Sequence, residues 1–260
     1  MLNTAIEAAK KAGERLSHHF EKTLFEREIK DDKSFVTCAD RESEDIIVSM
    51  IKDAFPEHGI VGEEGTDHNQ GAEYRWIIDP LDGTNNFVNG IPIFAISIAL
   101  TKGGEPVASV IYNPVTHSMY AAEKGGGMFY NGKPARVSDQ GADLGLVGFG
   151  PGGKEGKRLL DQAFVASSKH FKSKRYLGST ALELAYLARG GTEGFFCFGL
   201  NTWDYAAGTL LIQEAGGMIT DLKGGPWTLD TRYFIASNGV VHDQLVDIAT
   251  ALAVPPGAVV

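Results

Sequence analysis

WIIDPLDGTNNF, residues 76–87, places two carboxylates, Asp79 and Asp82, three positions apart at the end of an apolar run. The apolar residues predict a buried strand, and the proline and glycine that follow predict a sharp turn. Carboxylates at the end of a buried strand need a compensating cation, and their hard oxygens suit Mg²⁺ or Ca²⁺. The turn leads into residues 83–85, whose backbone N–H groups are expected to open a helix and face a phosphate. A cation beside a phosphate indicates phosphoryl chemistry.

Three further acids stand at similar junctions along the chain. Glu63 follows the strand-like residues 60–61 in the sequence GEEG, Asp204 follows Trp203, and Asp40 precedes a predicted helix. Each has an ordinary explanation when taken alone: a solvated loop for Glu63, and a helix N-cap for Asp40 and Asp204. Ligand sites in layered α/β folds gather at the carboxyl ends of strands, so the acids together favour one shared metal site.

The hydrophobic periodicity changes near residue 138. Residues 1–138 predict two amphipathic helices followed by a mostly antiparallel sheet, and residues 139–260 predict strands alternating with helices, a layered α/β pattern. Helices are expected at 4–21, 41–55, 155–171, 180–188, 205–215 and 242–252. Strands are expected at 60–61, 76–78, 95–101, 107–112, 119–122, 127–130, 144–149, 174–177, 194–198, 218–220 and 234–236. An irregular loop is expected over 28–40, and a frayed tail over 254–260.

The composition is typical of a folded, moderately acidic enzyme. The 260 residues, 43% of them hydrophobic, permit one large domain or two closely packed ones. The net charge of −9 disfavours a nucleic-acid partner. Cys38 and Cys197 show no CxxC or metal-ligand spacing, which predicts free thiols in a reducing compartment. With no signal-peptide pattern and no apolar run long enough to cross a bilayer, the expected location is the cytoplasm.

Rival catalytic schemes lack their motifs. The histidines show no HExxH or HxH spacing, and the chain contains no GxSxG nucleophile elbow and no GxxxxGK[ST] P-loop. His18 and His19 are expected on the surface of the first helix. Cys197 stands in the aromatic run FFCF, where a buried structural thiol is expected.

Three motifs together resemble the signature of the inositol monophosphatase family, a group of lithium-sensitive, magnesium-dependent phosphatases. They are GEE at 62–64, WIIDPLDGTNNF at 76–87 and WDYAAGTLLIQEAGG at 203–217, in order over nearly the whole chain. The resemblance implies a layered αβαβα sandwich, usually a homodimer, that hydrolyses a small phosphate monoester with two to three Mg²⁺ ions.

The resemblance also implies a set of metal ligands. Glu63, Asp79 and the backbone carbonyl of Leu81 would hold the first Mg²⁺. Asp79, Asp82 and Asp204 would hold the second, and Glu63 would help to hold a third ion through water. Lithium would inhibit by occupying the second position.

The nucleophile and the phosphate are assigned in the same way. The resemblance implies that Thr84, its hydroxyl polarised by Asp40, orients the attacking water on the first metal, which Glu63 holds. The N–H groups of Gly83 and Thr84 would bind phosphate oxygens. Two bridged cations suit an in-line displacement by water without a phosphoenzyme.

Substrate choice departs from the family pattern at one position. The family usually has a Glu that binds sugar hydroxyls seven residues before the WD aspartate, whereas this chain has Cys197 there, and a thiol accepts hydrogen bonds weakly. Hydroxyl and N–H groups of the loop at 178–180 are expected to compensate in part. The expected substrate contacts are Asp82, Gly83, Thr84, Gly178, Ser179, Thr180, Cys197 and Asp204.

Three functions remain open at this point. The leading one is a Mg²⁺-dependent phosphomonoesterase for a small polyol or sugar phosphate such as inositol monophosphate, with histidinol phosphate, fructose 1,6-bisphosphate and 3′-phosphoadenosine 5′-phosphate as alternative substrates. The second is a regulatory binding protein, since the resemblance includes bacterial relatives that bind the transcription machinery. The third is a Ca²⁺-stabilised protein without chemistry. The complete ligand set disfavours the second, and the Thr84 hydroxyl beside the metal disfavours the third.

Overall fold

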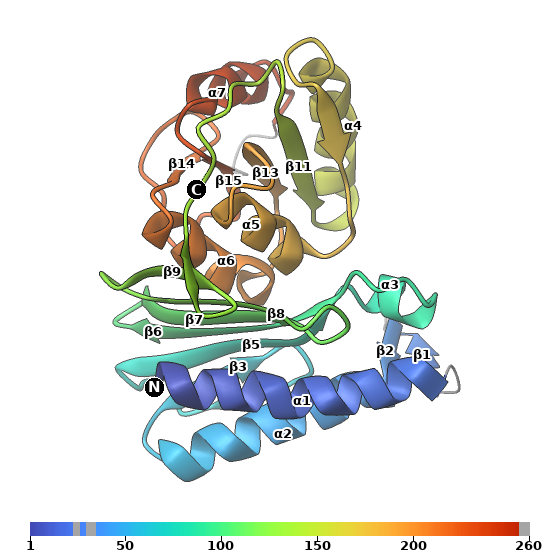
Figure 1. Cartoon of the computed structure of the whole chain (residues 1–260), viewed down its shortest axis with the longest axis vertical. Helices are drawn as coiled ribbons and strands as arrows, with labels where there is room; N and C mark the ends of the chain where they lie inside the picture. Colours follow the sequence, from blue (N-terminus) through green and yellow to red (C-terminus); the bar gives the residue numbers. More distant parts are fainter. Residues whose placement is uncertain (23–26, 30–34, 255–260) are drawn as a thin grey trace.

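Two antiparallel helices form the first layer of the molecule (Figure 1). In the computed structural model, which describes residues 1–22, 27–29 and 35–254, these are α1 (Leu2–Lys22) and α2 (Cys38–Ala54). The buried face of α1 is mostly alanine, which lets the helix approach the sheet closely. A Cβ added at Gly13 would lie 2.6 Å from the Tyr112 ring, so this position has no room for a side chain. Small residues at the contact therefore set how near α1 lies to the strands.

An eight-stranded sheet forms the second layer, in the order β10-β9-β8-β7-β6-β5-β3-β4. Its neighbours pair antiparallel except β3 and β5, which confirms the mostly antiparallel sheet expected for the first half. The strands are β3 (Gly59–Gly62), β4 (Asp67–His68), β5 (Tyr74–Asp82), β6 (Ala95–Lys102), β7 (Glu105–Asn113), β8 (Ser118–Glu123), β9 (Gly127–Tyr130) and β10 (Lys133–Ala135).

Two buried helices, α5 (Thr180–Ala188) and α6 (Thr202–Glu214), form the middle layer. Both are buried on nearly all sides because they lie between two sheets, which accounts for their lack of a polar face. Their side chains form one core cluster with residues of β6, β7 and β8 on one side and of β13 (Gly194–Phe198) and β15 (Tyr233–Ser237) on the other.

A five-stranded sheet and two helices complete the molecule. The sheet order is β12-β11-β13-β15-β14, with both parallel and antiparallel neighbours. Its strands are β11 (Leu146–Pro151), β12 (Ser173–Arg175), β13 (Gly194–Phe198), β14 (Met218–Asp221) and β15 (Tyr233–Ser237). Helices α4 (Gly153–Ser167) and α7 (His242–Thr250) cover its outer face. The five layers, αβαβα, confirm the expected fold class.

The stretch at 28–40 differs in part from the expected loop. Its ends belong to a short antiparallel pair, β1 (Arg27–Ile29) and β2 (Phe35–Thr37), and α2 already begins at Cys38. Residues 30–34 of that loop and 255–260 of the expected tail lie outside the described residues. Within the described part of the chain, none of the helices has the length and apolar content needed to span a membrane.

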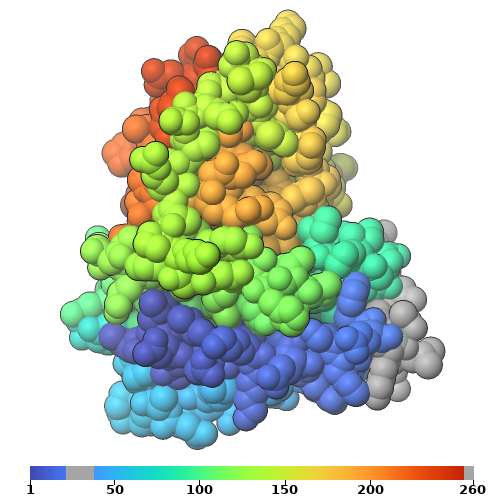
Figure 2. Space-filling view, viewed as in Figure 1, coloured from blue at the N-terminus to red at the C-terminus, as the bar shows by residue number. Residues whose placement is uncertain are grey.

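The two sheets are joined between Ala135 and Leu146, the interval that contains the proposed boundary after residue 138. Figure 2 shows the green segment around β7–β9 lying between α1, in blue, and the orange residues of the second half. The two halves meet where the middle layer packs against the eight-stranded sheet, and Asp82 at the end of β5 bonds Ser179 from the second half.

Candidate active site

Asp79 and Asp82 both belong to β5, which continues to Asp82 instead of ending at a turn after Ile78. Asp79 pairs with Ser97 and Asp82 with Ala95 on β6, and the register shifts between them. The expected end of the strand at Ile78 is therefore wrong: a bulge absorbs Pro80, because a bulged strand loses only local ladder bonds, and the turn comes at Gly83, whose φ is +94°. Since a bulge redirects side chains, two carboxylates three positions apart reach the same cluster.

The loop before α5 holds the Asp82 carboxylate. Asp82 Oδ2 accepts bonds from Ser179 Oγ at 2.5 Å and from Ala181 N at 2.8 Å. Asp82 Oδ1 accepts a bond from Thr180 N at 3.2 Å. The Asp79 carboxylate accepts a bond from Leu81 N at 3.0 Å. Two of the predicted substrate-side residues, Ser179 and Thr180, are thus brought to the acids, where they bind a carboxylate.

Asp204 comes to the same place from the second half of the chain. It stands in the first turn of α6 and accepts a bond from Asn201 N at 2.7 Å, so it is not the N-cap residue. One carboxylate oxygen from each of Asp79, Asp82 and Asp204 lies within 4.8 Å of the others. Residues 122 positions apart in the sequence, Asp82 and Asp204, therefore form one cluster with Asp79.

Glu63 lies beside this cluster. The Glu63 N–H donates to the Ile78 carbonyl at 3.1 Å, which extends the pairing of β3 with β5 to the start of the acidic segment. Its negative charge raises the pKa values of both Asp79 and Asp204.

The cluster is electrostatically unfavourable without a cation. Burial, followed by the charges of Glu63, Asp82 and Asp204, raises the pKa of Asp79 well above its usual range. Burial also raises the pKa of Asp82 to about 6, although three hydrogen bonds oppose the shift, and it raises the pKa of Asp204 strongly. Buried carboxylates of this kind favour a bound cation, and a donor set made only of oxygen fits Mg²⁺.

Thr84 and Asp40 form a pair next to the acids. Thr84 is the first residue of the short helix α3 (Thr84–Val88), and its hydroxyl lies 3.2 Å from Asp40 Oδ1 and 3.1 Å from the Leu81 carbonyl oxygen. Asp40 is buried in the first turn of α2. The pair predicted from residues 44 positions apart is thus in contact, and the carboxylate fixes the orientation of the hydroxyl.

Two side chains of α2 that the sequence analysis missed hold the same loops. Ser43 Oγ donates to the Pro80 carbonyl at 2.8 Å. The Glu44 carboxylate accepts bonds from Glu64 N at 2.9 Å, from Thr66 N at 3.1 Å and from Thr66 Oγ1 at 2.6 Å. Asp40, Ser43 and Glu44 follow helical spacing and lie on the buried face of α2. Polar residues at the helical positions of an apolar face were the sequence signal that could have identified Ser43 and Glu44.

Gly83 and Gly178 bring the two halves close together. Gly83 has a φ of +94°, and a Cβ there would lie 2.9 Å from the Ile93 carbonyl oxygen and 3.3 Å from the Gly178 carbonyl oxygen. Asn86 Nδ2 bonds both the Ile93 and the Leu177 carbonyls, at 2.7 and 2.8 Å. The loop at 178–180 is therefore fixed directly beside the start of α3.

The Cys197 side chain is fully buried, as expected for a structural thiol. It donates to the Arg232 carbonyl at 3.4 Å, and burial raises its pKa. A ligand would touch the thiol only if the cover of Cys197 moved. The exposed Arg232 side chain instead bonds the Leu200 and Gly199 carbonyls and Asn201 Oδ1, which lie between Cys197 and Asp204. No local sequence signal links Arg232 to this loop.

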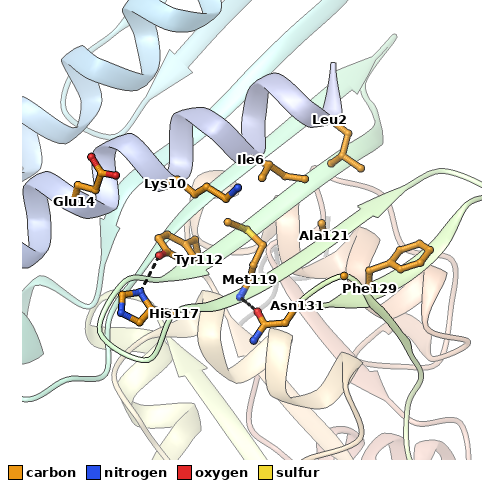
Figure 3. Close-up of a pocket in the computed structure, with 11 residues that line it drawn as sticks. Leu2, Ile6, Lys10, Glu14, Tyr112, His117, Met119, Ala121, Phe129 and Asn131 are labelled. Carbon is orange, nitrogen blue, oxygen red and sulfur yellow. Dashed lines mark hydrogen bonds between the residues drawn. The ribbon is translucent and has the colours of Figure 1, made fainter.

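A separate cavity of about 700 Å³ lies between α1 and the strands β7–β9 (Figure 3). Its walls include Leu2, Ile6 and Met119, and its polar contacts are the Tyr112 hydroxyl with His117 Nδ1 at 3.3 Å and Met119 N with Asn131 Oδ1 at 2.7 Å. None of the clustered carboxylates lines it, so the largely apolar cavity is not the place for phosphoester chemistry.

The comparison with known proteins agrees with the carboxylate cluster and the five layers. The family model described as "Inositol monophosphatase family" matches residues 1–252. The chain belongs to the inositol monophosphatase family. It is therefore a phosphoric monoester hydrolase of a family that acts on small phosphate monoesters and is generally Mg²⁺-dependent.

Several members of the inositol monophosphatase family match along almost their whole length. The inositol-1-monophosphatase of Mesorhizobium japonicum is 42% identical, over 95% of this chain and 94% of its own. The Nus factor SuhB of Pseudomonas aeruginosa is 39% identical, over 92% of this chain and 91% of its own. The crystal structure of extragenic suppressor protein suhB from Bartonella henselae superposes with a TM-score of 0.91 and 35% identity, over 96% of this chain and 98% of that one.

Proposed function

We propose that this phosphatase is a Mg²⁺-dependent hydrolase of a small polyol or sugar phosphate, such as inositol monophosphate. The observation that carries the proposal is the group of three carboxylates from Asp79, Asp82 and Asp204, whose oxygens lie within 4.8 Å of one another beside the Thr84–Asp40 pair. We further propose that the protein acts as a homodimer in the cytoplasm, that nucleic acid is not its substrate, and that lithium inhibits it.

The residues proposed to hold two to three Mg²⁺ ions are Glu63, Asp79, Asp82, Asp204 and the carbonyl of Leu81. The Leu81 carbonyl oxygen lies 3.1 Å from Thr84 Oγ1, and with the Thr84 proton donated to Asp40 its lone pairs are available to a metal. Bound Mg²⁺ would supply an acidified water and stabilise the leaving alkoxide of an in-line displacement, with no phosphoenzyme.

The side chain of Thr84 is proposed to orient the attacking water. Its hydroxyl donates toward Asp40, so its oxygen remains an acceptor for a water proton. The proposed role of Asp40 is to keep this donor direction constant, and Glu63 is proposed to act beside them through the metal that it holds. Backbone N–H groups of Gly83 and Thr84 are proposed to bind the phosphate.

The substrate end is proposed to lie between the loop at 178–180 and the loop at 199–201. Gly178, Ser179 and Thr180 are the proposed substrate contacts there: Gly178 is exposed, whereas Ser179 is as buried as Cys197 and Thr180 is also buried. The Ser179 hydroxyl and the Thr180 N–H already bind Asp82, which leaves polyol hydroxyls few protein partners in this loop.

A panel of phosphate-release assays with Mg²⁺, with and without Li⁺, tests the activity and ranks the substrates. The panel contains inositol monophosphate, histidinol phosphate, fructose 1,6-bisphosphate, 3′-phosphoadenosine 5′-phosphate and an aryl phosphate. Lithium-sensitive release from inositol monophosphate at the highest kcat/KM supports the proposal. A higher kcat/KM for another compound of the panel changes the proposed substrate only. Absence of phosphate release from all five compounds rejects the enzymatic function.

Thr84→Ala separates catalysis from a purely structural Ca²⁺ or Mg²⁺ site. Loss of a group that orients the nucleophile should lower kcat by about 10²-fold or more, while metal affinity changes little. Thr84→Ser, which keeps the hydroxyl, is the matched control and should retain most of the turnover. Equal losses of turnover and metal affinity would favour a structural site.

A regulatory role is a second candidate, because the Pseudomonas aeruginosa relative is named a Nus factor. Asp204→Ala should abolish hydrolysis and leave the exposed surface intact. A pull-down in which wild type and this variant capture the same transcription protein would support a binding function beside catalysis. If neither protein captures a transcription protein, the regulatory role is rejected and hydrolysis remains the proposed function.

A further inference from the structure

A second group of metal-ligating side chains lies outside the acid cluster, where the end of α1 meets the start of α2. It consists of His19, Cys38 and Glu42, and one ligand atom from each lies within 4.8 Å of the others. His19 Nε2 is 2.8 Å from Glu42 Oε2. Because α1 and α2 are antiparallel, the last turns of one helix lie beside the first turns of the other. The spacing of the cysteines along the chain therefore gave no hint of this group.

Each of these side chains is held in place by its helix. Cys38 is the first residue of α2 and Glu42 stands one turn later, so both project from one face. On α1, Arg15 stands one turn before His19 and its Nε also donates to Glu42 Oε2. Arg15 thus holds the same carboxylate oxygen that faces His19, which fixes the position of Glu42 in the group.

The group is within reach of solvent. The His19 side chain is 13% exposed and that of Glu42 is 37% exposed, and Cys38 is partly exposed. His19 is thus less exposed than the surface position expected for it, whereas its neighbour His18 is exposed. An ion can enter from solvent, and water can supply a fourth ligand.

We propose that His19, Cys38 and Glu42 form a second metal site, selective for a borderline-soft divalent ion such as Zn²⁺. Sulfur, imidazole and carboxylate donors suit Zn²⁺, whereas Mg²⁺ takes oxygen alone. Binding would place the ion between the His19 and Glu42 side chains, where His19 would bind through Nε2 once its proton has moved to Nδ1. The metal–sulfur bond would form as the Cys38 thiol proton is released to solvent. The occupied site joins α1 to the turn of α2 that contains Asp40.

Cobalt(II) spectroscopy tests the site without reference to hydrolysis. Co²⁺ is added to the full chain in excess Mg²⁺, which fills the oxygen-only cluster, and thiolate-to-cobalt absorption is recorded in the near ultraviolet. We expect this band in wild type and in Cys197→Ser, and its loss in Cys38→Ser. Absence of the band from saturated wild type, or its persistence in Cys38→Ser, would overturn the proposal.

Paired histidine variants give a second measurement. His19→Gln should weaken Zn²⁺ binding by roughly tenfold or more, because it removes a ligand, while His18→Gln on the same turn should bind as wild type. If Cys38→Ser does not fold, alkylation of Cys38 in wild type replaces it: Zn²⁺ should protect the thiol, and an unchanged alkylation rate would reject the site.

Discussion

Gly83 shows how one residue can be fixed by two separate constraints. Its φ of +94° disfavours any side chain, and a Cβ would also lie 2.9 Å from the Ile93 carbonyl oxygen. Gly104 has a similar φ of +87° but nothing within 4 Å of its Cβ position. Gly104→Ala should cost about 1–2 kcal/mol of stability through the backbone alone.

Gly83→Ala should cost about 1–3 kcal/mol more than that control, because the added methyl group must displace the loops at 93 and 178. It should also lower turnover, since Thr84 follows directly. Urea unfolding and phosphate release measure both effects. Equal destabilisation by the two substitutions would show that the close approach at Gly83 is unimportant.

His242 makes part of the stability depend on pH. It is buried, with Nδ1 2.8 Å from Ser237 Oγ and Nε2 2.9 Å from Thr220 Oγ1, and burial lowers its pKa below the ordinary 6.5. The unfolded chain therefore takes up a proton at a higher pH than the folded chain does. The contribution of His242 to the free energy of unfolding is fully present above pH 6.5 and declines as the pH falls toward the lowered pKa.

His242→Gln should consequently be less stable than wild type near neutral pH, with a difference in unfolding free energy that narrows from about pH 8 to about pH 5. Denaturant unfolding at several pH values provides the comparison, with His18→Gln as the exposed control. A difference that stays constant with pH would contradict the assignment.

For single residues, the sequence motifs predicted which side chains carry chemistry, but they did not predict contacts between residues far apart in the chain. Asp79, Asp82 and Asp204 carry chemistry that is readable from motifs, and the structure brings them together. Arg232 lies in no motif and acts through backbone carbonyls, so its sequence gives no sign of its partners. The burial of Cys197 also follows from packing against distant residues, although the aromatic run around it pointed the right way.

Helix α2 holds several loops of the site in place through Asp40, Ser43 and Glu44. Its Glu44 carboxylate accepts bonds from Glu64 N and from the N–H and hydroxyl of Thr66, and so orients the loop that carries Glu63. Glu44→Ala should raise the Mg²⁺ concentration needed for half-maximal hydrolysis by about 10–100-fold, the usual cost of losing an outer partner.

Asp45→Ala is the matched control, because Asp45 is adjacent on the same helix and exposed. It should leave the Mg²⁺ dependence unchanged. Titrations of activity against Mg²⁺ make the test, and circular dichroism checks the helix. If both variants show the Mg²⁺ dependence of wild type, Glu44 does not orient the loop that carries Glu63 for metal binding.

Elements were predicted well where one pattern governs them. Helix α5 spans Thr180–Ala188 as expected, because an apolar segment begins after the Gly178-Ser179 turn signals and ends before Gly190. Strand β5 was cut short at Ile78, since Pro80 usually ends a strand, and only pairing with β6 and a bulge carries it on to Asp82. The short strands β4 and β10 depend on their neighbours and carry too few residues for a pattern.

For the whole molecule, the carboxylate cluster links stability to metal. The charge of Asp204 raises the pKa of Asp79, while Asp82 and Glu63 raise that of Asp204, so Asp204→Asn removes a repulsion between the halves. Without metal, the variant should melt at a higher temperature than wild type. With Mg²⁺ at about 100 times its dissociation constant, wild type should gain about 2.7 kcal/mol and the variant far less.

Thermal unfolding in EDTA and in Mg²⁺ makes this comparison, with the exposed Asp247→Asn on α7 as control. The melting temperature of Asp204→Asn should lie above that of wild type in EDTA and below it in Mg²⁺. The melting temperature of Asp247→Asn should match that of wild type in both conditions. A loss of stability in EDTA for Asp204→Asn would show that the cluster is not under repulsion.

The bonds to Asp82 also have a consequence for synthesis on the ribosome. Its donors, Ser179, Thr180 and Ala181, follow it by 97, 98 and 99 residues, and Asp204 emerges later still. At about 5–20 residues per second, the acidic end of β5 therefore waits roughly 5–20 seconds for its donors. A nascent chain cannot complete the carboxylate cluster early, so the proposed Mg²⁺ site exists only after both halves have been made and joined.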